Sequence, residues 1–318
     1  SKDVLISSEI LYSTHDIAIT ETGKIFIAAN DGLYQLLDEK SQAQPELQLI
    51  TAGPDGENCH FAAITLANDR LYAACGLYGD KAFTAPVGKR WLLNNYMPEQ
   101  IAIFEIIFND DCSDCDATAF TVKSVVLPYA TFPRNIDLLA PGELLISLNI
   151  PEIDLTGDAL FKLTFSDSED SENLTITSIE PWSTQGTPHG FILHDNTLYH
   201  SMDTGVSLTS SPIHNGQIGT HSHFYNAAMV PNASIISNLT LFEGKLLVTQ
   251  ESFTAPLLGS NNITLIDIEN ETGAIIDRHL LRPDVVTSDA ILKRIDGELF
   301  VYYVSFYNGG VYKRFIDE

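Results

Sequence analysis

The segment DIAITETGKIFIAA, residues 16–29, contains the pattern that decides the fold: a polar start, an alternating apolar strand, a tight polar turn and a second apolar strand. The same pattern recurs five more times along the chain. The further copies are FAAITLANDRLYAAC (61–75), NIDLLAPGELLISL (135–148), HGFILHDNTLYHSM (189–202), NLTLFEGKLLVTQ (238–250) and DAILKRIDGELFVYYV (289–304). Six copies of one hairpin predict six repeats of one structural unit.

The spacing of the copies fits a four-stranded propeller blade, which takes roughly 40 to 50 residues. Candidates for third and fourth strands lie between them, such as 101–108 with 119–127, and 263–268 with 274–281. A β-sandwich explains six evenly repeated hairpins less well. The sequence therefore predicts an all-β fold, a six-bladed β-propeller, and needs no helix of meaningful length.

Closure of the ring is predicted from the two ends of the chain. The last copy is followed by only one further strand, 311–315, so the segment 3–11 is expected to join the last blade as its missing strand. We interpret residues 1–318 as a single propeller domain, either alone or as a module of a larger secreted protein. The first residues lack the layout of a signal peptide, which fits a mature protein or an excised module.

The charge balance excludes two classes of partner. The chain has 17 Lys and Arg against 42 Asp and Glu, a formal charge of −25, which repels nucleic acid and anionic lipid. No apolar run approaches the roughly 18 to 20 residues that a membrane span requires. We expect neither a nucleic-acid partner nor a membrane partner for this acidic protein.

The four cysteines indicate an oxidising compartment. Cys59 and Cys75 flank one predicted hairpin at the same end, within bridging reach, so a disulfide between them is expected. Cys112 and Cys115 are expected to form a local disulfide, because a zinc site would require two further ligands. Disulfides persist mainly outside the cytosol, which predicts an extracellular or periplasmic protein.

One face of the propeller is predicted to hold the functional site. First strands line the central channel, and their polar starts are His15-Asp16, His60, Arg134-Asn135, His189, Asn238 and Asp289. The predicted loops between second and third strands open on the same face, and four of them are long: 76–100, 149–158, 203–220 and 251–262. Long loops on a rigid scaffold usually carry binding and catalysis.

Six of the nine histidines map to this face. His15, His60 and His189 stand at strand starts, whereas His214, His221 and His223 lie in or beside the predicted 203–220 loop. A single histidine is more often structural than functional, but a convergence of several favours a metal or catalytic site. In an extended chain, His221 and His223 point to the same side.

The residues Pro188-His189-Gly190-Phe191-Ile192-Leu193, with Asp195, Leu198-Tyr199 and Asp203-Thr204, resemble the blade core of the gluconolactonase and regucalcin-like propellers, relatives of the paraoxonases. The resemblance implies one divalent cation. Its acidic ligand falls on Asp16 and its first Asn on Asn135, but its second Asn falls on His189 and its Asp on Asn238. Calcium prefers oxygen ligands and imidazole suits zinc, copper or iron, so the metal's identity stays open.

These observations favour a metal-dependent hydrolase of a small lactone or ester. The predicted metal ligands are Asp16, Asn135, His189, Asn238 and His15, and the predicted catalytic residues are His60 and His189. Predicted substrate-binding residues are Tyr78, Trp91, Tyr96, Arg134, His221, His223 and Asp289. The alternatives are a redox module with histidine-bound copper or iron or with a quinone, and a non-catalytic sugar- or protein-binding propeller, partnered by other modules of an extracellular protein.

Overall fold

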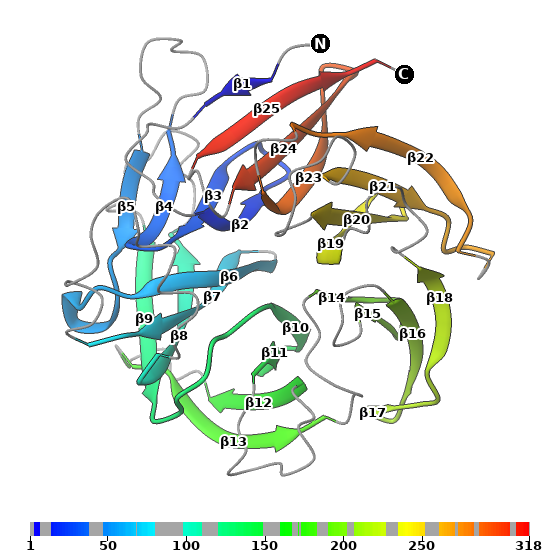
Figure 1. The fold of residues 1–318 in the computed structure, drawn as a ribbon. Coiled ribbons are helices and arrows are strands. Elements are labelled where there is room, and N and C mark those ends of the chain that lie inside the picture. Colours follow the sequence, from blue (N-terminus) through cyan, green and yellow to red (C-terminus); the bar gives the residue numbers. More distant parts are fainter. Residues whose placement is uncertain are drawn as a thin grey trace.

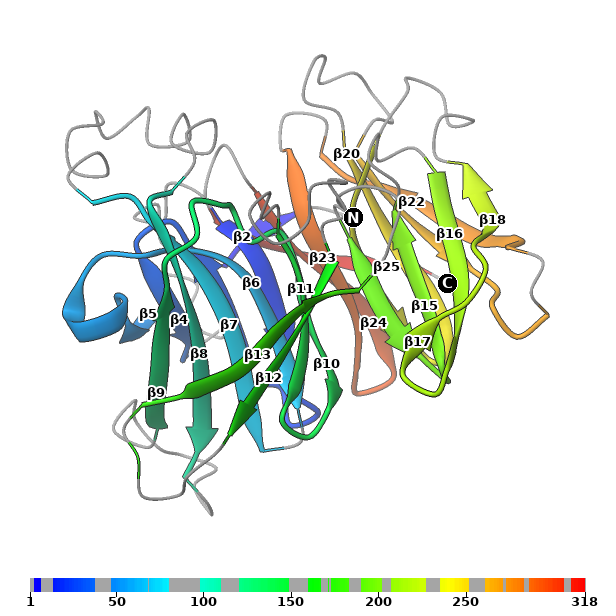
Figure 2. The same cartoon turned by 90° about the horizontal axis from the view of Figure 1, so that it is seen from below.

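The computed structural model consists of antiparallel sheets arranged as six blades around a central channel (Figure 1). In side view, the strands of each blade run obliquely between the two faces of the molecule (Figure 2). The predicted six-bladed propeller is therefore confirmed. The structure describes residues 3–6, 14–37, 47–67, 69–79, 98–109, 120–148, 160–166, 171, 173–182, 190–201, 207–226, 235–251, 261–270, 273–282, 286–305 and 310–317.

Each blade starts at the channel with its innermost strand and continues outward. Blades 1 to 3 consist of β2 (Thr14–Ile19), β3 (Ile25–Ala29), β4 (Gly32–Leu36) and β5 (Leu47–Thr51); β6 (His60–Ala67), β7 (Arg70–Leu77), β8 (Gln100–Phe108) and β9 (Phe120–Leu127); and β10 (Ile136–Ala140), β11 (Glu143–Ser147), β12 (Leu160–Ser166) and β13 (Thr175–Pro181). Only a short 3₁₀ turn at Pro54–Gly56 breaks the all-β pattern of the described residues.

Blades 4 to 6 follow the same plan, with one extra strand in blade 4. They consist of β14 (Phe191–His194), β15 (Thr197–Ser201), β16 (Ser207–His214), β17 (Gln217–Ile218) and β18 (Ser222–Asn226); β19 (Ile235–Phe242), β20 (Lys245–Glu251), β21 (Asn262–Ile266) and β22 (Ile275–Leu280); and β23 (Thr287–Ile295), β24 (Glu298–Ser305), β25 (Val311–Ile316) and β1 (Val4–Leu5). The innermost strands contact one another in the order β2, β6, β10, β14, β19, β23 and back to β2.

The turn between the first and second strand follows from local sequence. In blades 4, 5 and 6 it contains two consecutive residues with positive φ: Asp195-Asn196, Glu243-Gly244 and Asp296-Gly297. Such type I′ turns match the right-handed twist of a hairpin and favour Asn, Asp and Gly. The turn residues thus set the register that places one face of each strand against a neighbouring blade.

The N-terminal strand closes the ring as predicted. In β1, Val4 and Leu5 pair with Lys313 and Tyr312 of β25, which makes β1 the outermost strand of blade 6. The side chain of Asp3 accepts hydrogen bonds from Arg314 at 2.7 and 2.8 Å. Residues 7–11 of the predicted strand lie outside the described residues.

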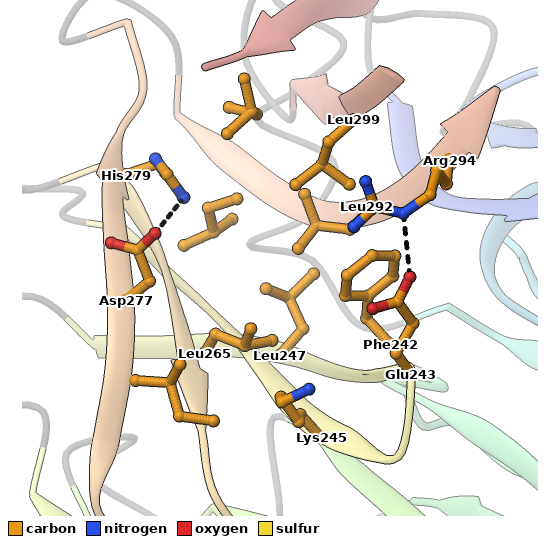
Figure 3. A pocket seen from close by; sticks show the side chains of 13 residues that line it. Phe242, Glu243, Lys245, Leu247, Leu265, Asp277, His279, Leu292, Arg294 and Leu299 are labelled. Atoms are coloured by element: carbon orange, nitrogen blue, oxygen red, sulfur yellow. Dashed lines mark hydrogen bonds and ion pairs between the residues drawn. The ribbon is translucent and has the colours of Figure 1, made fainter. Parts of the chain in front are cut away.

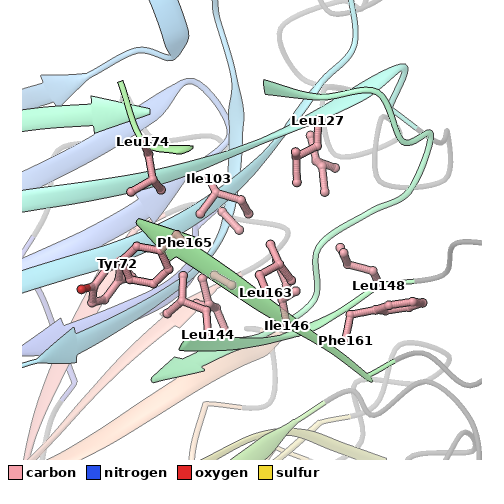
Figure 4. Packing of buried hydrophobic residues seen from close by; sticks show 14 residues of the cluster. Tyr72, Ile103, Leu127, Leu144, Ile146, Leu148, Phe161, Leu163, Phe165 and Leu174 are labelled. Atoms are coloured by element: carbon pink, nitrogen blue, oxygen red, sulfur yellow. The ribbon is translucent and has the colours of Figure 1, made fainter. Parts of the chain in front are cut away.

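The apolar core lies between blades rather than inside any one of them. Between blades 2 and 3, for example, Tyr72 and Ile103 pack against Leu144, Leu163 and Phe165 (Figure 4). Because the side chains of a strand alternate between its two faces, each blade contributes one row to the interface before it and one to the interface after it. Burial of these rows is what joins consecutive blades.

The prediction of a long loop at 203–220 is wrong. Residues Ser207–His214 form β16, the third strand of blade 4, and only 202–206 separate it from β15. β16 pairs with β18 on its outer side, so His221 and His223 lie beside or on the outermost strand. His214 stands at the turn between β16 and β17. These three histidines therefore do not converge on the channel.

The predicted disulfide between Cys59 and Cys75 is present, with Cα atoms 5.6 Å apart. Cys112 and Cys115 lie outside the described residues. A disulfide is compatible with the predicted extracellular or periplasmic location, which itself stays a prediction. No helix in the described part of the chain is long and apolar enough to span a bilayer.

Candidate functional site

Aspartate and asparagine side chains form a ring around the channel. They are Asp16, Asn135, Asn238 and Asp289, and they line a cavity of about 220 Å³. In each, Oδ1 accepts a hydrogen bond from the backbone N–H of the next residue, at 2.8 to 2.9 Å. The four side chains are buried, so these bonds also satisfy groups that water reaches poorly.

The same side chains link different blades. Asp16 Oδ2 accepts a hydrogen bond from the backbone N–H of Ile64 in blade 2, at 2.8 Å. The Asn135 amide donates to the backbone oxygen of Phe191 in blade 4 and to Oδ1 of Asn238 in blade 5, both at 3.1 Å. The ring thus ties inner strands together across the channel.

The carboxyl groups of Asp16 and Asp289 contact each other. Their side chains share a hydrogen bond, and Asp289 Oδ2 also accepts from the backbone N–H of Ile17 at 3.4 Å. Burial raises the pKa of both carboxyls, and the nearby charge of Asp16 raises that of Asp289 further. Both effects favour the neutral form of these carboxyls.

Sequence reasoning missed Asp137, which lines the same cavity. It accepts hydrogen bonds from the backbone N–H groups of Leu138 at 2.9 Å and Leu193 at 3.1 Å, and from the Thr65 hydroxyl at 3.2 Å. Burial raises the pKa of Asp137 to about 6. The available signal was its place two residues after Asn135, because strand alternation puts both on one side.

The ligand set carried over by resemblance was Asp16, Asn135, His189 and Asn238. In the structure, an oxygen of Asp16, Asn135 and Asn238 accepts a backbone N–H, which turns these atoms toward strands rather than toward a central ion. No group of three or more His, Cys, Asp or Glu among the described residues is arranged to hold a metal. His189 lies outside those residues, so a cation at the ring stays a prediction.

A second feature lies where β2 and β6 begin. The Nε2 atoms of His15 and His60 face each other at 2.5 Å, and both rings are buried. Burial lowers the pKa of His15 well below its usual value and that of His60 to about 3, so both imidazoles are neutral at pH 7. Neutral imidazole is the form that binds metal ions or acts as a base.

Polar atoms around this pair lack partners in the described part of the chain. His60 Nδ1 is buried and makes no hydrogen bond, and the hydroxyl of Tyr78 is buried without a partner as well. The Tyr78 ring lies 5.9 Å from that of His60, and the edge-on ring of Phe132 lies 5.7 Å from it. Since buried polar groups are normally satisfied, these two atoms are suited to bind a polar group of a ligand.

Local structure fixes the histidine pair. The pairing of β2 with β3 shifts register between Thr14 and Asp16, which makes His15 the extra residue of a β-bulge. The bulge lets His15 meet His60 while Asp16 enters the ring. His60 directly follows Cys59, whose disulfide to Cys75 anchors the start of β6. We refer to His15, His60, Tyr78 and Phe132 as the histidine pocket.

The remaining predicted site residues divide into two groups. His189, Trp91 and Tyr96 lie outside the described residues. Arg134 is exposed and directly precedes Asn135 of the ring.

Blade 4 carries its own histidine cluster, which the sequence did not reveal. Ser211 Oγ lies 2.5 Å from His221 Nδ1 and 3.3 Å from His200 Nε2, and Thr209 Oγ1 lies 2.8 Å from that same Nε2. His200 is fully buried in β15. His223 is exposed and contacts Ser207 at 3.0 Å. The hydroxyls satisfy the buried imidazole of His200 and the half-buried imidazole of His221, so this cluster resembles a structural network.

A larger cavity, of about 320 Å³, lies between blades 5 and 6 near their first-to-second turns (Figure 3). Its walls are mostly aliphatic, and four of its polar side chains form two pairs: Arg294 with Glu243 at 3.0 Å, and His279 with Asp277 at 3.0 Å. This pocket opens at the opposite end of the blades from the histidine pocket. Its paired charges offer little chemistry, so we place the candidate site at the histidine pocket and ring.

Comparison with known proteins is informative only at the level of structure. No protein-family profile matches the sequence. No curated protein sequence matches it.

Solved structures with the same architecture cover this chain almost completely. The soluble aldose sugar dehydrogenase from Escherichia coli, solved in the apo-form, has a TM-score of 0.59 at 14% identity over 100% of this chain and 99% of its own. A glucose dehydrogenase gives 0.57 at 13% over 100% of both chains. Virginiamycin B lyase from Staphylococcus aureus gives 0.51 at 14% over 99% of both. At such low identity these likenesses show the fold alone: the chain is a six-bladed β-propeller.

Proposed function

We propose that this propeller is a metal-dependent hydrolase of a small lactone or ester, with its chemistry in the histidine pocket. The observation that carries the proposal is the pair of neutral imidazoles, His15 and His60, whose Nε2 atoms converge. The two Nε2 atoms lie next to each other, and imidazole nitrogens suit a transition ion such as zinc, copper or iron better than calcium. The ring, including Asp16, then serves to hold the inner strands in register.

The residues of the pocket fit such an ion. His15 and His60 would bind it through Nε2, and His189 stays a predicted further ligand from a segment outside the described residues. A bound ion would polarise the substrate carbonyl and lower the pKa of a coordinated water. Both imidazoles are already neutral at pH 7, so metal binding requires no deprotonation of either ring.

Tyr78 and Phe132 are suited to hold the substrate. Burial raises the pKa of Tyr78 well above its ordinary value, so its hydroxyl remains a donor across the physiological range. Its unpartnered O–H can donate to the carbonyl oxygen of an ester, where negative charge develops during attack by water. Phe132 provides an apolar wall beside both imidazoles.

The test combines metal analysis with a substrate panel. We expect the purified protein, loaded with zinc, copper, iron or calcium and then desalted, to retain about one transition ion, and His60→Ala to lose most of it. His279→Ala removes an imidazole from the far pocket and serves as the matched control. Tyr78→Phe should retain metal but hydrolyse lactones and esters roughly 10²-fold more slowly. Equal metal retention by wild type and a His15→Ala, His60→Ala double variant would refute the proposal.

A redox module using the same pair is the second candidate. Imidazole suits copper and iron as well as zinc, and two of the similar structures are an aldose sugar dehydrogenase and a glucose dehydrogenase. Oxidation of aldoses with an artificial electron acceptor by the copper- or iron-loaded protein, combined with inactivity toward every ester and lactone, would favour this alternative. A quinone is less suited, because none of the described residues that line the cavity of the ring is Lys or Arg.

A further inference from the structure

The interface between blades 5 and 6 changes from apolar to polar toward the end where the inner strands begin. Its apolar part includes Leu247 of β20, with Ala290 and Tyr303 of β23 and β24. Two residues further along β20 stands Thr249, which faces the same side as Leu247 by strand alternation. In blade 6, Thr287 pairs with Ser305, and a bulge separates this pair from the pair formed by Ala290 and Tyr303. We infer that Thr287 and Ser305 face blade 5, as Ala290 and Tyr303 do.

Glu251 is the next residue of β20 on the same side as Thr249, at the polar end of the interface. It follows Thr249 by two residues in β20, so it also faces blade 6. The hydroxyl of Ser237 joins the two blades at this level, since it donates to the backbone oxygens of Thr249 at 3.2 Å and Thr287 at 3.1 Å. The strands that carry Glu251, Thr249 and Thr287 are thus held side by side. We call these three residues the interblade layer.

The oxygens of the interblade layer are buried and unsatisfied. Glu251 is 2% exposed, and Thr249 and Thr287 are 0% exposed. Glu251 Oε2 and the hydroxyl oxygens of both threonines have no hydrogen-bond partner among the described residues. Burial raises the pKa of Glu251 well above its ordinary value.

Such a group of atoms is costly unless something binds it. An unsatisfied buried hydroxyl costs about 1 to 3 kcal/mol, and an unpaired buried carboxylate costs more. Native proteins therefore satisfy such groups with water or an ion. A cation would neutralise the carboxylate and contact the hydroxyl oxygens, whereas water alone would require Glu251 either to keep a buried charge or to be protonated.

We propose that the interblade layer binds a hard metal cation between blades 5 and 6, with Glu251 as its one carboxylate ligand and the hydroxyls of Thr249 and Thr287 as neutral ligands. Oxygen-only donors select calcium, sodium or potassium over the transition ions that imidazole prefers. The site is separate from the histidine pocket and does not rest on the proposed hydrolase activity.

The experiment measures cation-dependent stability of the full chain. Protein stripped with EGTA is unfolded thermally in choline chloride, with calcium, sodium or potassium chloride added at constant ionic strength. A ligand that binds only the folded state raises Tm in a saturable manner. We expect saturable stabilisation of wild type by one of these ions, at least tenfold weaker binding in Glu251→Gln and weaker binding in Thr249→Val. Glu243→Gln, which removes the same charge from the far pocket, is the control.

The outcomes separate this site from the rest of the molecule. Glu251→Gln should fold, because its neutral amide resembles the protonated acid, and circular dichroism checks this directly. His60→Ala should keep the cation response even if the hydrolase proposal fails. Stabilisation that is lost only in the interblade variants supports the proposal and identifies the ion. No saturable response in wild type, or an equal response in Glu251→Gln, would overturn it in favour of bound water and a protonated Glu251.

Discussion

At the scale of single residues, buried polar side chains decide what this propeller can do, and His200 illustrates how burial controls their charge. Its imidazole contacts the hydroxyls of Thr209 and Ser211, whose oxygen also meets His221. Burial is the main reason why the pKa of His200 falls to about 4, and the nearby charge of His221 lowers it further. The folded protein thus keeps this ring neutral under conditions in which the unfolded chain protonates it.

We predict a measurable acid sensitivity from His200. Because its pKa is lower in the folded state, its contribution to stability is fully present above pH 6.5 and is lost as the pH falls toward 4. The expected loss is about 3 kcal/mol, because the pKa of His200 falls from its ordinary value of 6.5 to about 4 in the folded protein. In urea unfolding between pH 7.5 and 4.5, His200→Gln should lack this component, whereas His279→Gln should keep it. An identical pH slope in wild type and His200→Gln would contradict the prediction.

At the scale of elements, strand alternation and bulges assign each side chain to a face. Four inner strands shift register where they begin, at Thr14/Asp16, Phe61/Ala63, Ile236/Asn238 and Thr287/Asp289. A bulge places two consecutive residues against one partner and re-aims one of them. This is how His15 reaches His60 while Asp16 still lines the channel.

The element that closes the ring yields the second prediction. β1 contributes few apolar contacts, since Val4 and Leu5 are exposed, but it covers the edge of β25 and brings Asp3 to Arg314 and Tyr303. Deletion of residues 1–6 should therefore lower Tm of the whole ring by several degrees in one cooperative transition. Val4→Thr, a change at an exposed position of the same strand, should have little effect. A truncated chain with unaltered Tm and cooperativity would show that β1 does not close the ring energetically.

At the scale of the whole molecule, a formal charge of −25 surrounds a ring of inner strands joined by hydrogen bonds. Like charges on a compact surface repel one another, and the repulsion is relieved by unfolding. Attractive pairs such as Arg70 with Glu105, at 3.3 Å, oppose this effect locally. With 42 acidic against 17 basic residues, repulsion should dominate.

We accordingly expect salt to stabilise the protein. Screening shortens the range of charge interactions to roughly 10 Å at 0.1 M ionic strength, which weakens long-range repulsion more than contact pairs. Tm should rise between 20 and 300 mM choline chloride, whose bulky cation does not compete for the interblade layer. Sucrose, an uncharged stabiliser, serves to separate screening from general exclusion effects. A fall in Tm would mean that attractive ion pairs outweigh the net charge.

The sequence by itself determined the elements of this protein. Alternating apolar residues and turns such as Asp195-Asn196 and Asp296-Gly297 predicted every inner hairpin, the ring closure by the N-terminal strand and the Cys59–Cys75 disulfide. These features depend on local periodicity and on residues close in the hairpin, both of which are visible along the chain. The assignment of the N-terminal strand to the last blade followed from the need to cover a sheet edge.

Only the tertiary structure decided which side chains meet across blades. The sequence placed His221 and His223 in a channel loop, whereas pairing of β16 with β18 puts them at the outer edge of blade 4. It gave no sign that His15 faces His60. It also could not show that Glu251 is buried without a partner. Such contacts depend on bulges, on the packing of one blade against the next and on burial. All three are set by residues that lie far apart in the chain.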